Sequence, residues 1–216
     1  MPGLRGQVGM DVKGTAFLAR KVMLFEEIGE EEYNRFLAEI ARKEPIFGQP
    51  IIATTLIPIG SFIAFNEAVV ERFYAGDPAA YLRFGEKSAE YALLIGPYKR
   101  IRETNSVSAF VESARFIYQG YYTAGRAEGT LDGDDAELKI HGIPAEHRHL
   151  YFEYAISAYV RRGIELTGMR AASMSRVLGF SRGDEEIHYR YHIETKPAPG
   201  PFGPRRSASG QWLAPR

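Results

Sequence analysis

The segment AEGTLDGDDAELKIHG, which runs from Ala127 to Gly142, decides the fold because its apolar residues follow a different spacing from those of the preceding chain. Two short runs flank Asp132 and Gly133, a dipeptide typical of a tight turn. In the second run, Leu138 and Ile140 alternate with polar residues, which is the period of a half-buried strand. The segment therefore predicts a β-hairpin.

Before this hairpin, apolar residues recur at the spacing of amphipathic helices. Gly29 and Gly76 interrupt the pattern, and Asp77 followed by Pro78 is a strong signal for a helix start. Pro58 limits the apolar run around it to a short extended segment. The predicted helices are 15–28, 31–43, 61–73, 77–95 and 106–122.

After the hairpin, the sequence predicts one long helix over 146–167 and two strands over 171–180 and 185–195. Helices, hairpin, helix and hairpin thus follow one another along the chain. This order predicts an α+β fold in which a helical layer packs on a twisted antiparallel sheet of about four strands.

The chain divides into three parts by composition. Residues 12–195 are expected to form a single α+β domain of the ligand-binding kind, preceded by a flexible N-terminus over 1–11. Residues 196–216 are rich in proline, glycine and arginine, and we expect a disordered tail there.

The overall composition excludes several classes of function. The 216 residues carry 27 basic and 27 acidic side chains, a balance that argues against nucleic-acid binding. There is no cysteine, which excludes disulfides and thiolate chemistry. The most apolar stretch, 51–65, is too short to span a bilayer, and the N-terminus lacks the apolar run of a secretory signal. We expect a soluble, cytoplasmic protein.

The histidine pair His188 and His192 lies in the segment IHYRYHI, whose strict alternation predicts a strand. Four positions on a strand separate two side chains by about 13 Å, too far to bind one metal ion. Their face is expected to be solvated or to contact a partner, and we expect no metal site. One alternative stays open, in which one of the two joins His141 of another strand.

Aromatic residues are the main candidates for a binding site. The sequence contains no phosphate-binding loop, nucleophile elbow or zinc-protease motif, so we expect no catalytic residues and lean towards a protein that is not an enzyme. Amphipathic aromatic side chains line cavities for flat or apolar ligands, although they also build cores and protein interfaces. The expected ligand-binding residues are Tyr118, Tyr122, Phe152, Tyr159, Tyr189 and Tyr191.

Four segments carry a resemblance to a known family: VKGTAFLAR (12–20), FYAGDPAAYLRFGEKSAEYAL (73–93), IYQGYYTAGRAE (117–128) and GFSRGDEEIHYRYHI (179–193). They resemble a paralogous bacterial family of unknown function, over about residues 12–195. Its domain is similar to the haem-NO-binding, four-vinyl-reductase and TRAPP-like ligand-binding folds. The resemblance implies a helical layer over a twisted antiparallel sheet, with a pocket between them.

The same resemblance bears on cofactors. The haem-binding branch of the superfamily uses a histidine on a helix and a Tyr-x-Ser-x-Arg signature for the propionates. This chain has no such signature and no histidine before His141, and the acylated cysteine of TRAPP-like proteins is absent too. We therefore expect no cofactor.

The leading hypothesis is a non-enzymatic ligand-binding or sensory module. It would take a small apolar or aromatic ligand and act through a protein partner or a homodimer. One alternative is a structural protein that dimerises or docks a partner through its aromatic surface. The other is a haem or tetrapyrrole protein.

Overall fold

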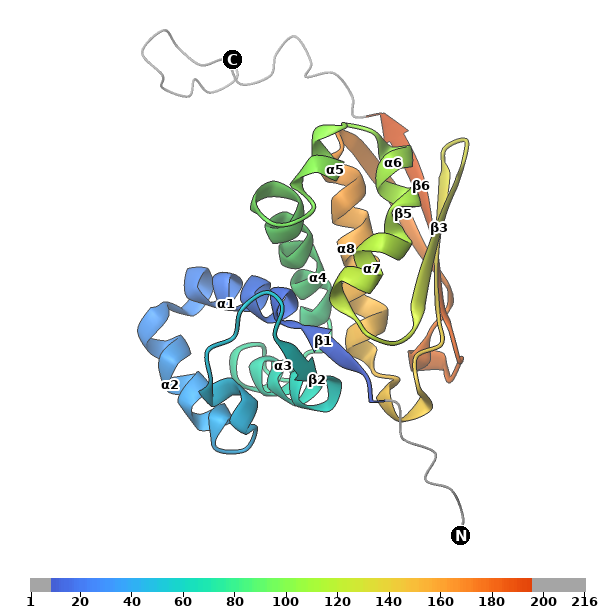
Figure 1. The fold of residues 1–216 in the computed structure, drawn as a ribbon. Helices are drawn as coiled ribbons and strands as arrows, with labels where there is room; N and C mark the ends of the chain where they lie inside the picture. Colours follow the sequence, from blue (N-terminus) through green and yellow to red (C-terminus); the bar gives the residue numbers. More distant parts are fainter. Residues whose placement is uncertain (1–8, 196–216) are drawn as a thin grey trace, which may run out of the picture.

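The computed structural model describes residues 9–195, so the predicted C-terminal tail lies outside the described residues. Figure 1 shows helices gathered on one side of the molecule and a twisted sheet on the other. The elements before the sheet are β1 (Asp11–Lys13), α1 (Gly14–Ile28), α2 (Glu30–Ala41), η1 (Pro45–Gly48), β2 (Leu56–Pro58), α3 (Ile59–Phe73), α4 (Ala80–Glu90), the π-helical turn η2 (Tyr91–Ile95), α5 (Lys99–Glu103), α6 (Val107–Glu112) and α7 (Ala114–Tyr121).

The C-terminal part contains the sheet and the longest helix. Its elements are β3 (Arg126–Asp132), β4 (Asp135–His141), η3 (Ala145–His147), α8 (Leu150–Leu166), β5 (Met169–Leu178), η4 (Phe180–Arg182) and β6 (Ile187–Thr195). The four strands pair antiparallel in the order β3-β4-β6-β5. The predicted α+β fold with a helical layer on a four-stranded antiparallel sheet is therefore confirmed.

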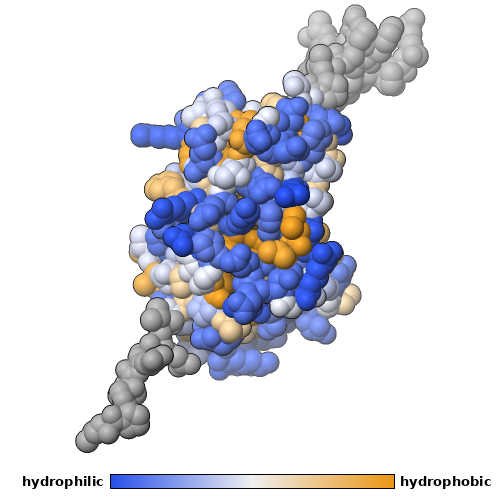
Figure 2. Space-filling model, turned by 90° about the vertical axis from the view of Figure 1, so that its right-hand side faces the viewer, coloured by the Kyte–Doolittle hydropathy of each residue, from blue (hydrophilic) through white to orange (hydrophobic). Residues whose placement is uncertain are grey.

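The two faces of the sheet differ as the alternation predicts. Leu138 lies opposite Tyr189, and Ala136 lies opposite Tyr191, and these four side chains are buried against the helical layer. The outer face is polar, and Figure 2, which views the molecule from the sheet side, shows a mostly hydrophilic surface with small hydrophobic areas. Because the two faces carry different chemistry, a one-residue slip in register would be strongly disfavoured.

Helix α8 is the centre of the domain, since it packs on the sheet with one side and on α4 with the other (Figure 1). The α4–α8 contact is close because Gly85 has no side chain: a Cβ there would lie 1.9 Å from the carbonyl oxygen of Ala155. Small residues at a helix crossing let the two backbones approach, and here they bring two helices together above the sheet.

The N-terminal helices join this layer through β1. Strand β1 pairs antiparallel with β2, and Val12 also forms a bridge with Tyr122 at the end of α7. Stacked and tilted rings fill the space between α1, α2 and α3, among them Phe17, Phe36 and Phe65. No helix among residues 9–195 combines the length and the apolar character that a membrane span requires.

Two predicted helices differ in detail. The helix expected over 106–122 is broken at Ser113, whose hydroxyl donates to the carbonyl of Phe110 at 2.7 Å. The long helix starts later than expected, at Leu150, because His149 caps it by accepting a bond from the amide of Tyr151 at 3.0 Å. Local side-chain bonds of this kind compete with the helical pattern and set the ends of both helices.

Candidate functional site

A cavity of about 60 Å³ lies between the helical layer and the sheet. Its walls come from α1, α4, α6, α7, α8, β3 and β4, and they are almost entirely apolar or aromatic. This volume has room for a few water molecules or a small chemical group. It is well below the roughly 300–1,000 Å³ of clefts that hold drug-sized ligands.

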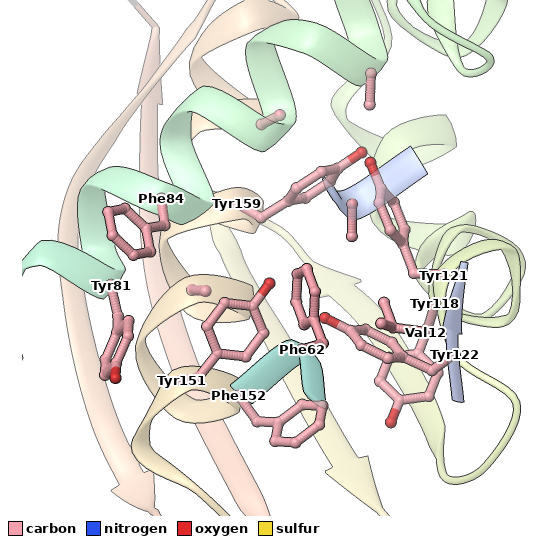
Figure 3. Close-up of a cluster of buried hydrophobic side chains, with 14 of the residues drawn as sticks. Val12, Phe62, Tyr81, Phe84, Tyr118, Tyr121, Tyr122, Tyr151, Phe152 and Tyr159 are labelled. Carbon is pink, nitrogen blue, oxygen red and sulfur yellow. The ribbon is translucent and has the colours of Figure 1, made fainter. Parts of the chain in front are cut away.

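The hydroxyls of Tyr121 and Tyr159 are the unusual feature of this cavity. Both side chains line it, and both hydroxyl oxygens are buried with no hydrogen-bond partner beyond one another. Figure 3 shows the two oxygens pointing toward one another from α7 and α8. A buried hydroxyl without a partner costs about 1–3 kcal/mol, so this pair is an unsatisfied polar site in an apolar cavity.

A second polar group adjoins the cavity from α1. Arg20 is fully buried, and its guanidinium lies 3.6 Å above the ring of Phe84. Its Nε donates to Oδ1 of Asn66 at 3.1 Å, while Nη2 has no hydrogen-bond partner. Burial lowers the pKa of Arg20 to about 10, which leaves it a cation at neutral pH.

The hydroxyl of Tyr151 connects this cation to the cavity. Burial raises the pKa of Tyr151, and the neighbouring Arg20 and Tyr122 oppose the rise. Both tyrosines line the cavity, as does Ala16, one helical turn before Arg20. The site thus has two polar ends: Tyr121 and Tyr159 at one, and Tyr122, Tyr151 and Arg20 at the other.

The buried tyrosines make the fold sensitive to alkaline pH. Burial raises the pKa of Tyr81 and Tyr189 to about 12, and it raises that of Tyr121, Tyr122 and Tyr191 well above the usual 10. In the unfolded chain these groups lose their protons near pH 10, whereas the folded protein keeps them. The resulting stability is fully present below pH 10 and falls as pH rises through the folded values.

We therefore expect cooperative unfolding above about pH 10. Between the unfolded and the folded pKa, each such tyrosine should lower the free energy of unfolding by about 1.4 kcal/mol per pH unit. The measurement follows tyrosinate absorbance and circular dichroism together across the pH range. The two signals should change at the same pH. Ionisation of all 13 tyrosines near pH 10 with the circular dichroism unchanged would contradict burial of these side chains.

The structure distributes the six predicted ligand-binding residues over three places. Tyr118, Tyr122 and Tyr159 line the cavity. Phe152 lies in the core against Tyr122. Tyr189 and Tyr191 lie on β6 beneath α8, where Tyr191 donates to the carbonyl of Ser157 at 3.0 Å. A ligand-binding role for the six stays a prediction.

The histidines lie away from the cavity. His188 and His192 face outward on β6, where they bind Glu137 and Asp135 at 3.1 and 2.9 Å. His141 contacts Glu128 on β3 at 3.1 Å. Within residues 9–195, no cluster of three or more histidine and acidic side chains could hold a metal ion.

Sequence reasoning did not select Arg20, Tyr121 or Tyr151 as site residues. A signal for Arg20 exists, because it falls on the apolar stripe of α1, between Phe17 and Leu24. A charged residue is rarely buried without a partner, so an arginine on an apolar stripe indicates a candidate site residue. Nothing in local spacing distinguishes Tyr121 from the neighbouring Tyr122.

Comparison with protein-family models gives no match, and comparison with curated proteins gives none either. Solved structures do match. An H-NOX (haem-NO-binding) protein from S. oneidensis in the Fe(II)NO state has 11% identity and a TM-score of 0.67, covering 85% of this chain and 99% of that chain. A mutant H-NOX protein from K. algicida, in the unliganded Fe(II) state, has 12% identity and a TM-score of 0.59, covering 86% of this chain and 98% of that chain.

These neighbours contradict the expectation of no cofactor, because they are haem-binding proteins solved with iron in their sites. The cavity of this chain tests the match. Its walls carry tyrosine hydroxyls, and no histidine of residues 9–195 is among the lining residues. These residues therefore do not fit a histidine-ligated haem. The likeness concerns the path of the chain: residues 9–195 adopt the H-NOX fold.

Proposed function

We propose that this protein is a ligand-binding sensory module whose ligand occupies the cavity between the helical layer and the sheet. The observation that carries the proposal is the pair of buried hydroxyls of Tyr121 and Tyr159, which have no polar partner beyond one another on an otherwise apolar wall. Polar groups without partners in apolar surroundings destabilise the folded protein. Proteins often tolerate this loss of stability at a binding site, where a ligand later supplies the missing hydrogen bonds. The H-NOX fold supports a sensory role.

The cavity selects the chemistry of the ligand. An apolar or aromatic group fits the walls, and a polar atom of the ligand would accept or donate hydrogen bonds at Tyr121 and Tyr159. Because the volume is about 60 Å³, a ligand of the size of a single ring requires side chains to move aside. Binding is thereby coupled to the positions of α7 and α8, which supply the two hydroxyls.

A sensory module must pass its state to another protein, and exposed apolar side chains are available for this. Leu94, Ile95 and Phe116 are 41%, 71% and 65% exposed, and Phe116 continues into the buried layer through a ring contact with Tyr98. Protein contact through a partner or a second copy stays a prediction, as does a cytoplasmic location.

The expected result for Tyr159→Phe is a more stable protein that binds less ligand. Loss of an unpartnered hydroxyl should raise the free energy of unfolding by about 1 kcal/mol. The affinity for phenylacetamide, a neutral ring with a hydrogen-bonding group, should fall about three- to tenfold. Ligand-observed NMR and chemical denaturation measure the two quantities.

Tyr191→Phe is the matched control, because that hydroxyl is also buried but donates to Ser157 and lies outside the cavity. It should lower stability by about 1 kcal/mol and leave binding unchanged. Absence of binding by the unsubstituted protein, together with a clean apo mass after gentle purification, would overturn the proposal. A haem titration followed by absorption belongs in the same assay, since the solved neighbours are haem proteins.

A further inference from the structure

Arg20 is a buried cation without a counter-ion. It is 0% exposed, and no carboxylate of the described residues lies within ion-pair distance of it. By contrast, the fully buried carboxylate of Glu153 is paired with Arg176 at 2.5 Å. A buried charge is expensive unless it is paired, so an uncompensated one in a well-packed core calls for a physical reason.

The contacts that Arg20 does make are all with neutral groups. Nε donates to Asn66, and Nη1 lies 3.2 Å from the sulfur of Met23. The Asn66 amide is itself held by the carbonyl of Phe62 at 2.7 Å, which fixes its oxygen toward Arg20. These contacts, with the ring of Phe84, orient the guanidinium but do not neutralise it.

On its remaining side the guanidinium adjoins the hydroxyl of Tyr151, a neutral group that lines the cavity. Tyr151 and Tyr122 interact with one another, and Tyr151 also interacts with Arg20, so the guanidinium lies directly behind the cavity wall. An oxyanion placed against these two hydroxyls would accept hydrogen bonds from them. The positive charge of Arg20, which lies behind Tyr151, would stabilise the negative charge of the oxyanion. Such charge-assisted bonds are about twice as strong as neutral ones.

We propose that Arg20, Tyr151 and Tyr122 form an anion subsite at the α1 end of the cavity, and that the ligand is a small apolar molecule with a carboxylate group. The inference rests on the proposed function and specifies its ligand. The apolar body occupies the space beside Ala155 and Val160, and the carboxylate supplies the charge that Arg20 lacks.

The test compares phenylacetate with phenylacetamide, which has the same shape and no charge. The unsubstituted protein should bind the acid about tenfold more tightly or better. Arg20→Met should remove this preference, and Arg20→Lys, which keeps the charge but not the geometry, should retain part of it. Tyr191→Phe should leave the preference intact, because that side chain lies outside the cavity.

Equal affinities for acid and amide in the unsubstituted protein would overturn the anion subsite and leave the proposed function standing. Binding of neither probe would overturn both. Thermal unfolding of the ligand-free proteins gives an independent readout. If Arg20 is held for a ligand, Arg20→Met should unfold at the same or a higher temperature. A clear fall in that temperature would assign Arg20 a structural role and overturn the inference.

Discussion

Replacement of Glu153 by alanine is expected to lower the free energy of unfolding by about 2–4 kcal/mol, because it leaves Ser181 and the partly exposed Arg176 without their buried partner. Glu153 is 0% exposed on α8. Its carboxylate accepts bonds from the Ser181 amide at 2.8 Å and the Ser181 hydroxyl at 2.9 Å, and it pairs with Arg176 on β5. One side chain thus fastens α8 to the loop between β5 and β6.

Glu39→Ala is the matched control, since that carboxylate also pairs with an arginine, Arg72, but is 54% exposed. Exposed pairs contribute about 0–1 kcal/mol, so the control should change stability little. Chemical denaturation of both variants measures the difference. Equal, small losses in the two variants would show that the Glu153 network is solvated and does not hold the sheet to α8.

The second large effect is expected for Gly85→Ala, which should cost about 3 kcal/mol, at the upper end for overpacking. The added Cβ would meet backbone atoms of Ala155, the nearest at 1.9 Å, and backbone yields less readily than a side chain. Helices α4 and α8 must then separate. Because Gly85 and Ala155 also line the cavity, the variant should bind phenylacetamide differently as well.

Gly60→Ala controls for the change of residue type. Gly60 lies in α3, and a Cβ there would have no neighbour within 4 Å. An alanine at that position should stabilise the helix by about 0.5–1 kcal/mol. Thermal and chemical unfolding of the two variants should therefore give shifts of opposite sign. A stabilised Gly85→Ala protein would contradict the close crossing of α4 and α8.

The polar groups of the candidate site share one feature: they are buried in or behind the cavity wall without a full set of partners. Tyr121 and Tyr159 each bury a hydroxyl without a partner, and Arg20 buries a charge without a counter-ion. The buried carboxylate of Glu153, by contrast, has both a cationic partner and hydrogen bonds from Ser181. The contrast between the two kinds of buried group is what directs attention to the cavity.

Local pattern predicted the four strands of the sheet and most of the helices, but not β1, α5 or the break between α6 and α7. The change of period at Ala127–Gly142 predicts the hairpin, and the alternation of IHYRYHI predicts β6 and separates its two histidines. Both follow from geometry within a few residues of the chain. The same patterns drew attention to the aromatic residues, of which Tyr118, Tyr122 and Tyr159 line the cavity.

The site itself was decided by tertiary structure. Arg20 reaches Tyr151 only because α1 and α8, far apart in sequence, are brought to one cavity, and α8 approaches α4 only because Gly85 meets Ala155. Which of two adjacent tyrosines leaves its hydroxyl unpartnered depends on how helices cross. Spacing along the chain determines which face of a helix is buried, whereas the packing of several helices determines what each buried group meets.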